Sequence, residues 1–299
     1  MQQQKTKKRK LKDFARRNEK WGFILLAPWM VGVVLFLLYP LIQVVIYSFS
    51  EIKLDLTGIQ QTFIGIQNYV YLFKEHATFY QILMTTFAEV IPDSIIIVFF
   101  ALFAAILLNG EYKGRTIARV IFFLPIIMAT DLISVELATT GIAADTSTGD
   151  SASGMMFLAD FIINNTGLPE SLISTILGIV GGVFDTIKLS GVQTLIFLAG
   201  LQAINPSLYE VAKIEGATGY ETFCKVTMPM ISPMILICAV YTITDALTRA
   251  EIIDLMHTTA FKYASYGQSS AMSVIFLVLG LALVGITAWL IGKKVYYSD

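Results

Sequence analysis

The stretch INPSLYEVAKIEGATGYETFCKVTMPMISP, residues 204–233, carries the strongest structural signals in the chain. Asn205 is a favoured helix N-cap residue, and Pro206 suits the first helical position, where its missing N–H has no partner to lose. Gly216 supplies the left-handed conformation that commonly ends a helix. These residues predict a short helix that begins after Asn205 and ends at a glycine corner.

A second helix is expected directly after this corner. Thr218 and Glu221 have the T-x-x-E spacing of a capping box, in which the two side chains satisfy free backbone N–H groups reciprocally. Pro229 and Pro233 then mark the beginning of an apolar segment. The stretch therefore predicts two short helices at a membrane face, joined by a tight glycine turn.

The composition shows which solvent surrounds the rest of the chain. Of 299 residues, 56% are hydrophobic and 14% are charged, whereas a soluble domain carries about 25% charged residues. A membrane helix needs about 20 apolar residues, and its backbone must satisfy its own hydrogen bonds. Six runs meet this requirement, at about 21–49, 79–108, 117–139, within 171–203, 230–249 and 270–291.

Two of these runs have special features. The first run follows a basic stretch but is too long for a signal peptide, so we interpret it as an uncleaved signal anchor. The fourth run exceeds one span and contains Asp185 and Lys188, so its outer half is expected to be either broken or lying on the surface. Gly178 and Gly182 form a GxxxG pattern that indicates close helix packing.

Positively charged residues predict the orientation of the spans. With the N-terminus inside, 16 of the 21 Lys and Arg residues lie on cytoplasmic segments, which agrees with the positive-inside rule. The basic segment 1–20 then faces anionic lipid in the cytoplasm. The net charge of -1 gives no indication of a nucleic-acid partner. Cys224 and Cys238 are interpreted as small hydrophobic residues without a redox role.

The cytoplasmic stretch also has a family resemblance. Glu210-Val211-Ala212, then three residues, Gly216, nine residues and the segment 226–229 (VTMP) resemble the EAA loop of ATP-binding-cassette (ABC) importer permeases. In that family the loop docks on the ATP-hydrolysing subunit and transmits its closure to the spans. The resemblance assigns ATPase coupling to Glu210, Ala212, Glu215, Gly216, Met228 and Pro229.

Other motifs are similar, in the same order, to the maltose-permease-like carbohydrate group. They are Ala27-Pro28 with Tyr39-Pro40, the segment 63–69, Gly114-Arg115 with Arg119, the segment 123–125, and the segment 198–204. The chain departs from that group at Arg249-Ala250-Glu251, where a Gly-Gly-Pro is usual. It also departs at Asp131 and Glu136, which lie in or beside the third run.

This resemblance implies an all-α membrane protein with six transmembrane helices of the type I ABC importer permease fold and a cytoplasmic N-terminus. A basic segment at 1–20 would precede a permease domain at 21–299, with the coupling loop at 204–229. The expected location is the bacterial plasma membrane, with both termini cytoplasmic. The implied partners are a second permease, more readily a different one than a copy, two ATPase subunits and an extracellular solute-binding protein. ATP and Mg²⁺ would bind to the ATPase subunits only.

The resemblance also indicates where a sugar would bind. Alignment outward from the loop carries the substrate-binding role to residues of the fourth and fifth runs: Asp185, Lys188, Leu189, Val192, Tyr241, Thr244, Asp245 and Thr248. The last four recur at helical spacing and share one face. Ionisable groups at membrane depth often mark a solute pathway.

Other interpretations of these polar residues stay open. Asp185 and Lys188 could form a structural ion pair, and the stripe from Tyr241 to Thr248 could pack against the partner permease. Asp131 and Glu136 could pair with Arg249 or meet the binding protein.

Enzymatic and metal-binding functions have no support in the sequence. There is no P-loop motif for ATP, and His76 and His257 lack the companions of a metal site. Neither catalytic residues nor metal ligands are therefore expected. A different class is an ion-coupled secondary transporter or channel that uses Asp131, Glu136, Asp185 and Asp245. An ABC permease for a polyamine or a sugar phosphate is a further alternative.

Overall fold

The computed structural model describes residues 25–55, 58–110, 112–117, 119–120, 122 and 170–295. The basic segment 1–20, most of the expected third span, and Asp131 and Glu136 lie outside these residues. Contacts divide the chain into one unit of residues 1–84 and 251–279 and a second unit of residues 85–250 and 280–299.

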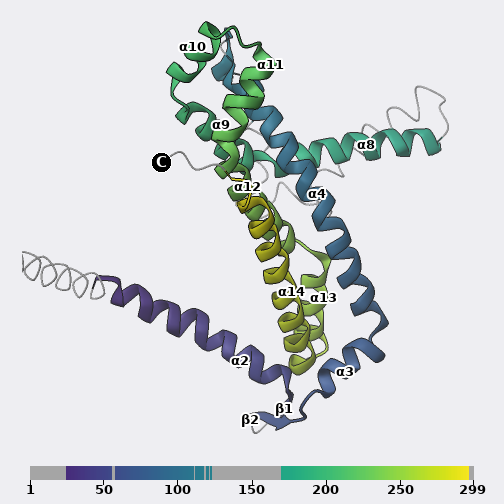
Figure 1. Cartoon of the computed structure of the whole chain (residues 1–299). Helices are drawn as coiled ribbons and strands as arrows, with labels where there is room; N and C mark the ends of the chain where they lie inside the picture. The colour runs from purple at the N-terminus through teal and green to yellow at the C-terminus, as the bar shows by residue number, and fades with distance from the viewer. Residues whose placement is uncertain are drawn as a thin grey trace, which may run out of the picture. The chain divides into compact units, whose positions relative to one another are not determined.

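Helices dominate the described chain (Figure 1). They are α2 (Tyr39–Ser48), α3 (Gln67–Lys74), α4 (Ala77–Asn109), α8 (Glu170–Leu189), α9 (Gly191–Ala203), α10 (Pro206–Ile214), α11 (Gly219–Thr222), α12 (Met228–Thr248), α13 (Glu251–His257) and α14 (Tyr266–Gly292). Short π-helical segments lie at Val34–Leu38, Phe223–Thr227 and Thr258–Lys262.

Four helices of the described residues are long and apolar enough to cross a membrane: Leu25–Ser48, Thr78–Asn109, Gly219–Lys262 and Tyr266–Gly292. A fifth candidate is the pair Gly181–Leu189 and Gly191–Ala203, which is bent by 53°. These five correspond to the first, second, fourth, fifth and sixth runs of the sequence. A total of six spans stays a prediction.

The fourth run is broken at Ser190, which agrees with the first of the two alternatives predicted from the sequence, a broken span. Ser190 is buried, and its hydroxyl donates to the carbonyl of Ile187 at 3.0 Å. The hydroxyl of Thr194 donates in turn to the carbonyl of Ser190 at 2.8 Å. The Ser190 carbonyl also accepts a hydrogen bond from the Thr194 N–H at 2.9 Å, so these polar groups at the bend are paired within the protein, which is the condition for irregular backbone at membrane depth.

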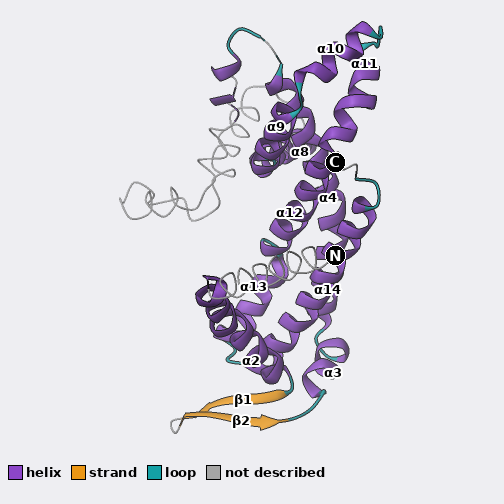
Figure 2. Ribbon diagram, turned by 60° about the vertical axis from the view of Figure 1, so that its left-hand side comes forward, coloured by secondary structure: helices purple, strands orange, loops and turns teal. Residues whose placement is uncertain are grey.

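The expectation of an all-α chain needs one correction, because a β-hairpin follows the first span (Figure 2). Strands β1 (Ser50–Asp55) and β2 (Gly58–Phe63) pair antiparallel, with Ser50 opposite Phe63. The sequence of β1 alternates Ile52 and Leu54 with charged neighbours, which is the period of a strand and not of a helix.

Side-chain hydrogen bonds tie this hairpin to α3 and to the end of α2. Asn68, which is buried, donates to the carbonyls of Ser48 at 2.9 Å and Ser50 at 3.1 Å. The Tyr69 hydroxyl donates to the Ser48 hydroxyl at 2.7 Å. The start of α14 joins the same point, because Gly267 lies so close to the carbonyl of Ser50 that a Cβ there would overlap it.

The second unit is built on the packing of α9 against α12. Its buried core includes Phe197 and Leu201 of α9, Ile231 and Cys238 of α12, and Ala105 of α4. The buried amide of Gln193 on α9 donates to the hydroxyl of Thr242 on α12 at 2.9 Å. A buried hydrogen bond is directional, so it fixes the register of the two helices as well as their contact.

Arg119 has a structural role that its sequence motif did not reveal. Its guanidinium donates twice to the carbonyl of Leu108, at 3.2 and 3.0 Å, in the last turn of α4. Carbonyls in this turn have no partner within the helix, and a cation there also opposes the negative end of the helix dipole.

We expect Gly267→Ala to lower stability by about 1–3 kcal/mol, because the added methyl group overlaps backbone that cannot move independently. Gly285→Ala is the matched control on the same helix, since no heavy atom lies within 4 Å of its Cβ position. The measurement is the temperature at which the detergent-solubilised protein loses its monodisperse size-exclusion peak. Equal melting of both variants would contradict the close approach of α14 to the hairpin.

Candidate functional site

The helix at the beginning of the 204–229 loop forms as predicted. The Asn205 side chain accepts a hydrogen bond from the Ser207 N–H at 3.0 Å, and Pro206 is the first residue of α10. Gly216 has φ of 76°, in the left-handed region that other residues adopt only with strain. The N-cap and the glycine corner are therefore both confirmed.

The capping box of the second helix is also confirmed. The Glu221 N–H donates to the Thr218 hydroxyl at 3.3 Å, and the Thr218 N–H donates to the Glu221 carboxylate at 3.0 Å. These bonds from Thr218, with a smaller contribution from Lys225, lower the pKa of Glu221. Because this pKa is lowered, the capping box stabilises the fold at pH values above the usual pKa of a free Glu. That stabilisation is lost as the pH falls through the lowered pKa.

The second helix is not a separate short helix, which corrects the sequence prediction. α11 continues through the π-helical segment Phe223–Thr227 into α12, so one helix runs from the corner into the span. In the π turn the Met228 N–H bonds to the carbonyl of Phe223. The π turn shifts the hydrogen-bond pattern directly before Pro229, which lets the continuous helix accommodate a residue without an N–H.

The six residues assigned to coupling are distributed over the hairpin: Glu210 and Ala212 lie in α10, Glu215 and Gly216 lie at the corner, and Met228 and Pro229 lie at the start of α12. Figure 1 shows α10 and α11 on the two sides of this corner. Glu210, Glu215 and Gly216 are exposed, Ala212 is buried, and Met228 and Pro229 are half-buried in the following helix. A hollow of about 350 Å³ lies beside the corner and is lined by Ala212, Glu215, Gly216, Ala217, Glu221, Thr222, Lys225 and Val226.

Two large side chains beside the corner were missed by sequence reasoning. Ile214 is 86% exposed and Tyr220 is 77% exposed, one on each side of Gly216. Large side chains are costly to expose to water in a loop that leaves the membrane, and they favour a protein partner at this corner. Their position beside the turn residues is the sequence signal that could have identified them.

The predicted polar face of the fifth span is present on α12. Tyr241, Thr244 and Thr248 are exposed along it, while Thr242 lies on the buried side. Asp245 forms an ion pair with Arg249 one turn later. The partner of Arg249 in the described chain is therefore Asp245, and a carboxylate held in this way still has lone pairs for a second donor.

The fourth-span residues form a different group. Asp185 and Leu189 line a pocket of about 540 Å³ together with Asp93 and Phe100 of α4. Among the described residues no hydrogen bond or ion pair joins Asp185 to Lys188, so the ion-pair alternative gains no support. No residue of α12 is among those lining this pocket, so the two predicted halves of the substrate site do not share one pocket in the described part of the chain.

Asp93 was not recognised from the sequence, although a signal existed. It is an ionisable residue inside a long apolar run, and such residues are costly in lipid and often functional. The signal was masked because Asp93 carries no motif of its own. Only the arrangement of α4 beside α8 brings its carboxyl to the same pocket as that of Asp185.

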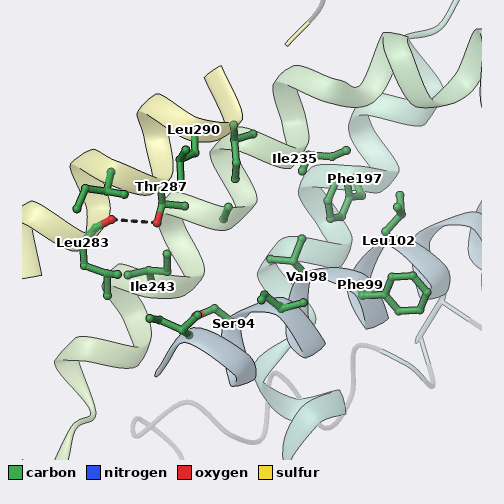
Figure 3. Close-up of a pocket in the computed structure, with 15 residues that line it drawn as sticks. Ser94, Val98, Phe99, Leu102, Phe197, Ile235, Ile243, Leu283, Thr287 and Leu290 are labelled. Carbon is green, nitrogen blue, oxygen red and sulfur yellow. Dashed lines mark hydrogen bonds between the residues drawn. The ribbon is translucent and has the colours of Figure 1, made fainter. Parts of the chain in front are cut away.

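A further pocket, of about 560 Å³, has an almost entirely apolar lining (Figure 3). Its walls come from α4, α9, α12 and α14, and include Val98, Phe197, Ile243 and Leu290. The Thr287 hydroxyl donates to the carbonyl of Leu283 at 2.9 Å. A hydroxyl-rich solute would find almost no hydrogen-bond partners here, so this pocket is not the candidate solute site.

No cluster of three or more His, Cys, Asp or Glu side chains occurs within the residues that the structure describes. The expectation that the chain binds no metal stays a prediction.

The chain resembles several curated transport proteins along most of its length. MalF, a trehalose/maltose transport system permease protein of Thermococcus litoralis, is 30% identical over 285 residues, covering 89% of this chain and 92% of the relative. MsmF, a multiple sugar-binding transport system permease protein of Streptococcus mutans, is 27% identical over 294 residues, covering 89% and 94%. No protein-family model matches the chain.

A solved structure shares the fold. It belongs to a bacterial ABC transporter involved in the import of the acidic polysaccharide alginate, with a TM-score of 0.59 and 20% identity. The similarity covers 95% of this chain and 99% of that one. The curated relatives and this common fold show that the chain belongs to the permease subunits of ABC importers, in the group that includes the sugar-transport permeases.

Proposed function

We propose that this permease forms half of the translocation pathway for a sugar or oligosaccharide and is driven by ATPase subunits that dock on the 204–229 hairpin. The observation that carries the proposal is the rigid corner of that hairpin. Caps fix both of its helices, Gly216 sets the turn, and two large apolar side chains stand exposed beside it. A preorganised corner loses little entropy on docking, which makes it suitable for transmitting force.

The hairpin is mechanically connected to the spans on both of its sides. Tyr209 of α10 lies within hydrogen-bond distance of the Thr227 hydroxyl, at 3.2 Å. Beyond the hairpin, Phe197 of α9 packs with Ile231 of α12, and Gln193 bonds to Thr242. A displacement of the corner would therefore move α9 and α12 as one body, together with the exposed polar face of α12.

The partners follow from this arrangement. Two ATPase subunits would bind ATP and Mg²⁺, so that this chain itself is not an enzyme. A second, different permease would complete the pathway, and an extracellular binding protein would deliver the solute. Another solved relative of the same fold, with a TM-score of 0.61, is an alginate ABC transporter in complex with a periplasmic protein that holds an alginate pentasaccharide, which supports this last partner by analogy.

The proposed topology has six spans in the bacterial inner membrane, with both termini in the cytoplasm. The segment 1–20 would lie on anionic lipid, and the permease domain would occupy 21–299. The excess of Lys and Arg on the proposed inner segments supports this orientation. The β-hairpin and α3 would then lie on the outer side.

The solute would contact the polar face of α12 and residues of the fourth span. Tyr241 offers an aromatic ring for stacking on a sugar, and Thr244, Asp245 and Thr248 offer oxygen atoms to its hydroxyl groups. The fourth-span residues Asp185, Lys188, Leu189 and Val192 would contribute from α8 and α9. The pocket shared by Asp93 and Asp185 favours one alternative, a cationic solute such as a polyamine.

The orientation predicts the labelling of a natural cysteine. Cys224 is exposed on the hairpin, whereas Cys238 is buried. We expect a membrane-impermeant maleimide to leave Cys224 unmodified in intact cells and to modify it after permeabilisation, with Cys224→Ser as the blank. A Gln60→Cys variant on the β-hairpin should react in intact cells. Modification of Cys224 in intact cells would contradict the proposed orientation of the chain in the membrane.

The coupling role predicts a difference between two glycines of the hairpin. Gly216→Val places a β-branched residue at φ 76° and should strain the corner by about 1–2 kcal/mol. Gly219→Ala, at the start of α11, meets no atom within 4 Å and is the control. In the reconstituted transporter, Gly216→Val should lower stimulation of ATPase activity by the loaded binding protein about tenfold or more, equivalent to ~1.4 kcal/mol.

Glu210→Ala tests the same role without disturbing the backbone of the corner, because Glu210 is exposed on α10. It should also uncouple the ATPase, while Gln202→Ala at the end of α9 should not. Full stimulation in both Gly216→Val and Glu210→Ala would contradict docking at this hairpin.

The solute pathway predicts a role for the ring of Tyr241. Tyr241→Ala should raise the solute concentration for half-maximal uptake about fivefold, since stacking contributes on the order of 1 kcal/mol, whereas Tyr241→Phe should preserve uptake. Ile237→Ala, exposed one turn earlier on α12, is the control. Unchanged uptake by Tyr241→Ala, with normal assembly, would remove Tyr241 from the pathway.

A further inference from the structure

Helix α3 has an apolar face that no described part of the protein covers. Ile66, directly before the helix, is 66% exposed, Val70 is 42% exposed and Phe73 is 56% exposed. Their spacing of four and three residues places them on one side of the helix, which we call the α3 apolar face. On the other side, Asn68 and Leu72 are buried against the protein.

The hydrogen bonds of α3 fix its level relative to the spans. Asn68 binds the carbonyl of Ser48, the residue at which the first span ends. Gly267, in the first turn of the last span, lies against Ser50, which also binds Asn68. The second span begins at Thr78, four residues after α3 ends at Lys74. Three spans thus end beside α3, which must lie where helices leave the hydrocarbon (Figure 2).

An aromatic contact shows which side of α3 faces the bilayer. The ring of Phe73 meets that of Phe79 edge-on, with centroids 6.2 Å apart. Phe79 is fully buried in the first turn of α4, and α4 continues from there into the membrane. The contact therefore places Phe73, and with it the α3 apolar face, toward the membrane side of the helix.

The borders of the face have the chemistry of a membrane–water boundary. Gln67 and Lys74 are exposed beside the apolar residues, and Lys74 lies in the last turn of α3. A lysine at this level extends its stem along apolar surface and its ammonium to lipid phosphates. Amphipathic helices of this kind bind in the interface plane, with their apolar side buried to the depth of the headgroup–acyl boundary.

We propose that α3 is an interfacial helix that inserts Ile66, Val70 and Phe73 into the lipid leaflet at which these three spans end. The occupant of the α3 apolar face is lipid. The helix then ties the ends of three spans to the bilayer surface, independently of which solute is carried. The proposal needs only that these spans cross the membrane, so it can fail while the proposed transport function stands.

The test places a fluorophore on the face in the complete, assembled transporter. In a Cys224→Ser background, Val70→Cys carries a bimane label, and Gln60→Cys on the β-hairpin is the matched exposed control. Nanodiscs contain phosphatidylcholine spin-labelled at the headgroup, high on the acyl chain or near the chain end. Val70 takes no part in the contact between the rings of Phe73 and Phe79, so its replacement leaves that contact intact.

We expect the label at position 70 to lose about half of its fluorescence with lipid spin-labelled high on the acyl chain and less with lipid labelled near the chain end, as an interfacial depth requires. The label at position 60 should respond to aqueous iodide instead. Strong iodide quenching at position 70 that the binding protein abolishes would overturn the proposal in favour of a protein docking face. Protection from both quenchers would overturn it in favour of contact with the partner permease.

Discussion

Lipid offers no hydrogen bonds to a peptide backbone, and this constraint determines where the chain departs from regular helix. Within the described spans, the one sharp break lies at Ser190, where backbone and hydroxyl groups of the protein pair with each other. The tighter irregularities, namely the β-hairpin and the Gly216 corner, lie beyond the ends of spans, where water replaces missing partners.

Local signals in the sequence predicted the 204–229 hairpin well, because capping depends on residues within one turn of each other. Asn205, Gly216, Thr218 and Glu221 all have the predicted roles. The limits of the other five apolar runs, the third lying mostly outside the described residues, also agree with the helices to within a few residues, except where α11 continues into α12. That continuity depends on a π turn at Phe223–Thr227, for which no simple sequence signal exists.

The surroundings of the proposed substrate-binding residues were less predictable, because they depend on contacts between segments distant in sequence. The spacing from Tyr241 to Thr248 correctly predicted a single face on α12. It did not predict that Asp245 pairs with Arg249, or that Asp185 shares a pocket with Asp93 of another helix. The β-hairpin was missed for a different reason: its strands are short and polar, and they contribute little to an interpretation based on apolar runs.

The continuous helix from Gly219 to Thr248 determines how far the Gly216 corner can lie from the hydrocarbon layer. Thirty helical residues rise about 45 Å, whereas the hydrocarbon layer is about 30 Å thick. With the predicted span 230–249 in the hydrocarbon layer, residues 219–229 rise about 16 Å beyond it, toward the corner at Gly216. At that distance the proposed ATPase subunit could bind the corner beyond the headgroups, without moving its own surface from water into lipid.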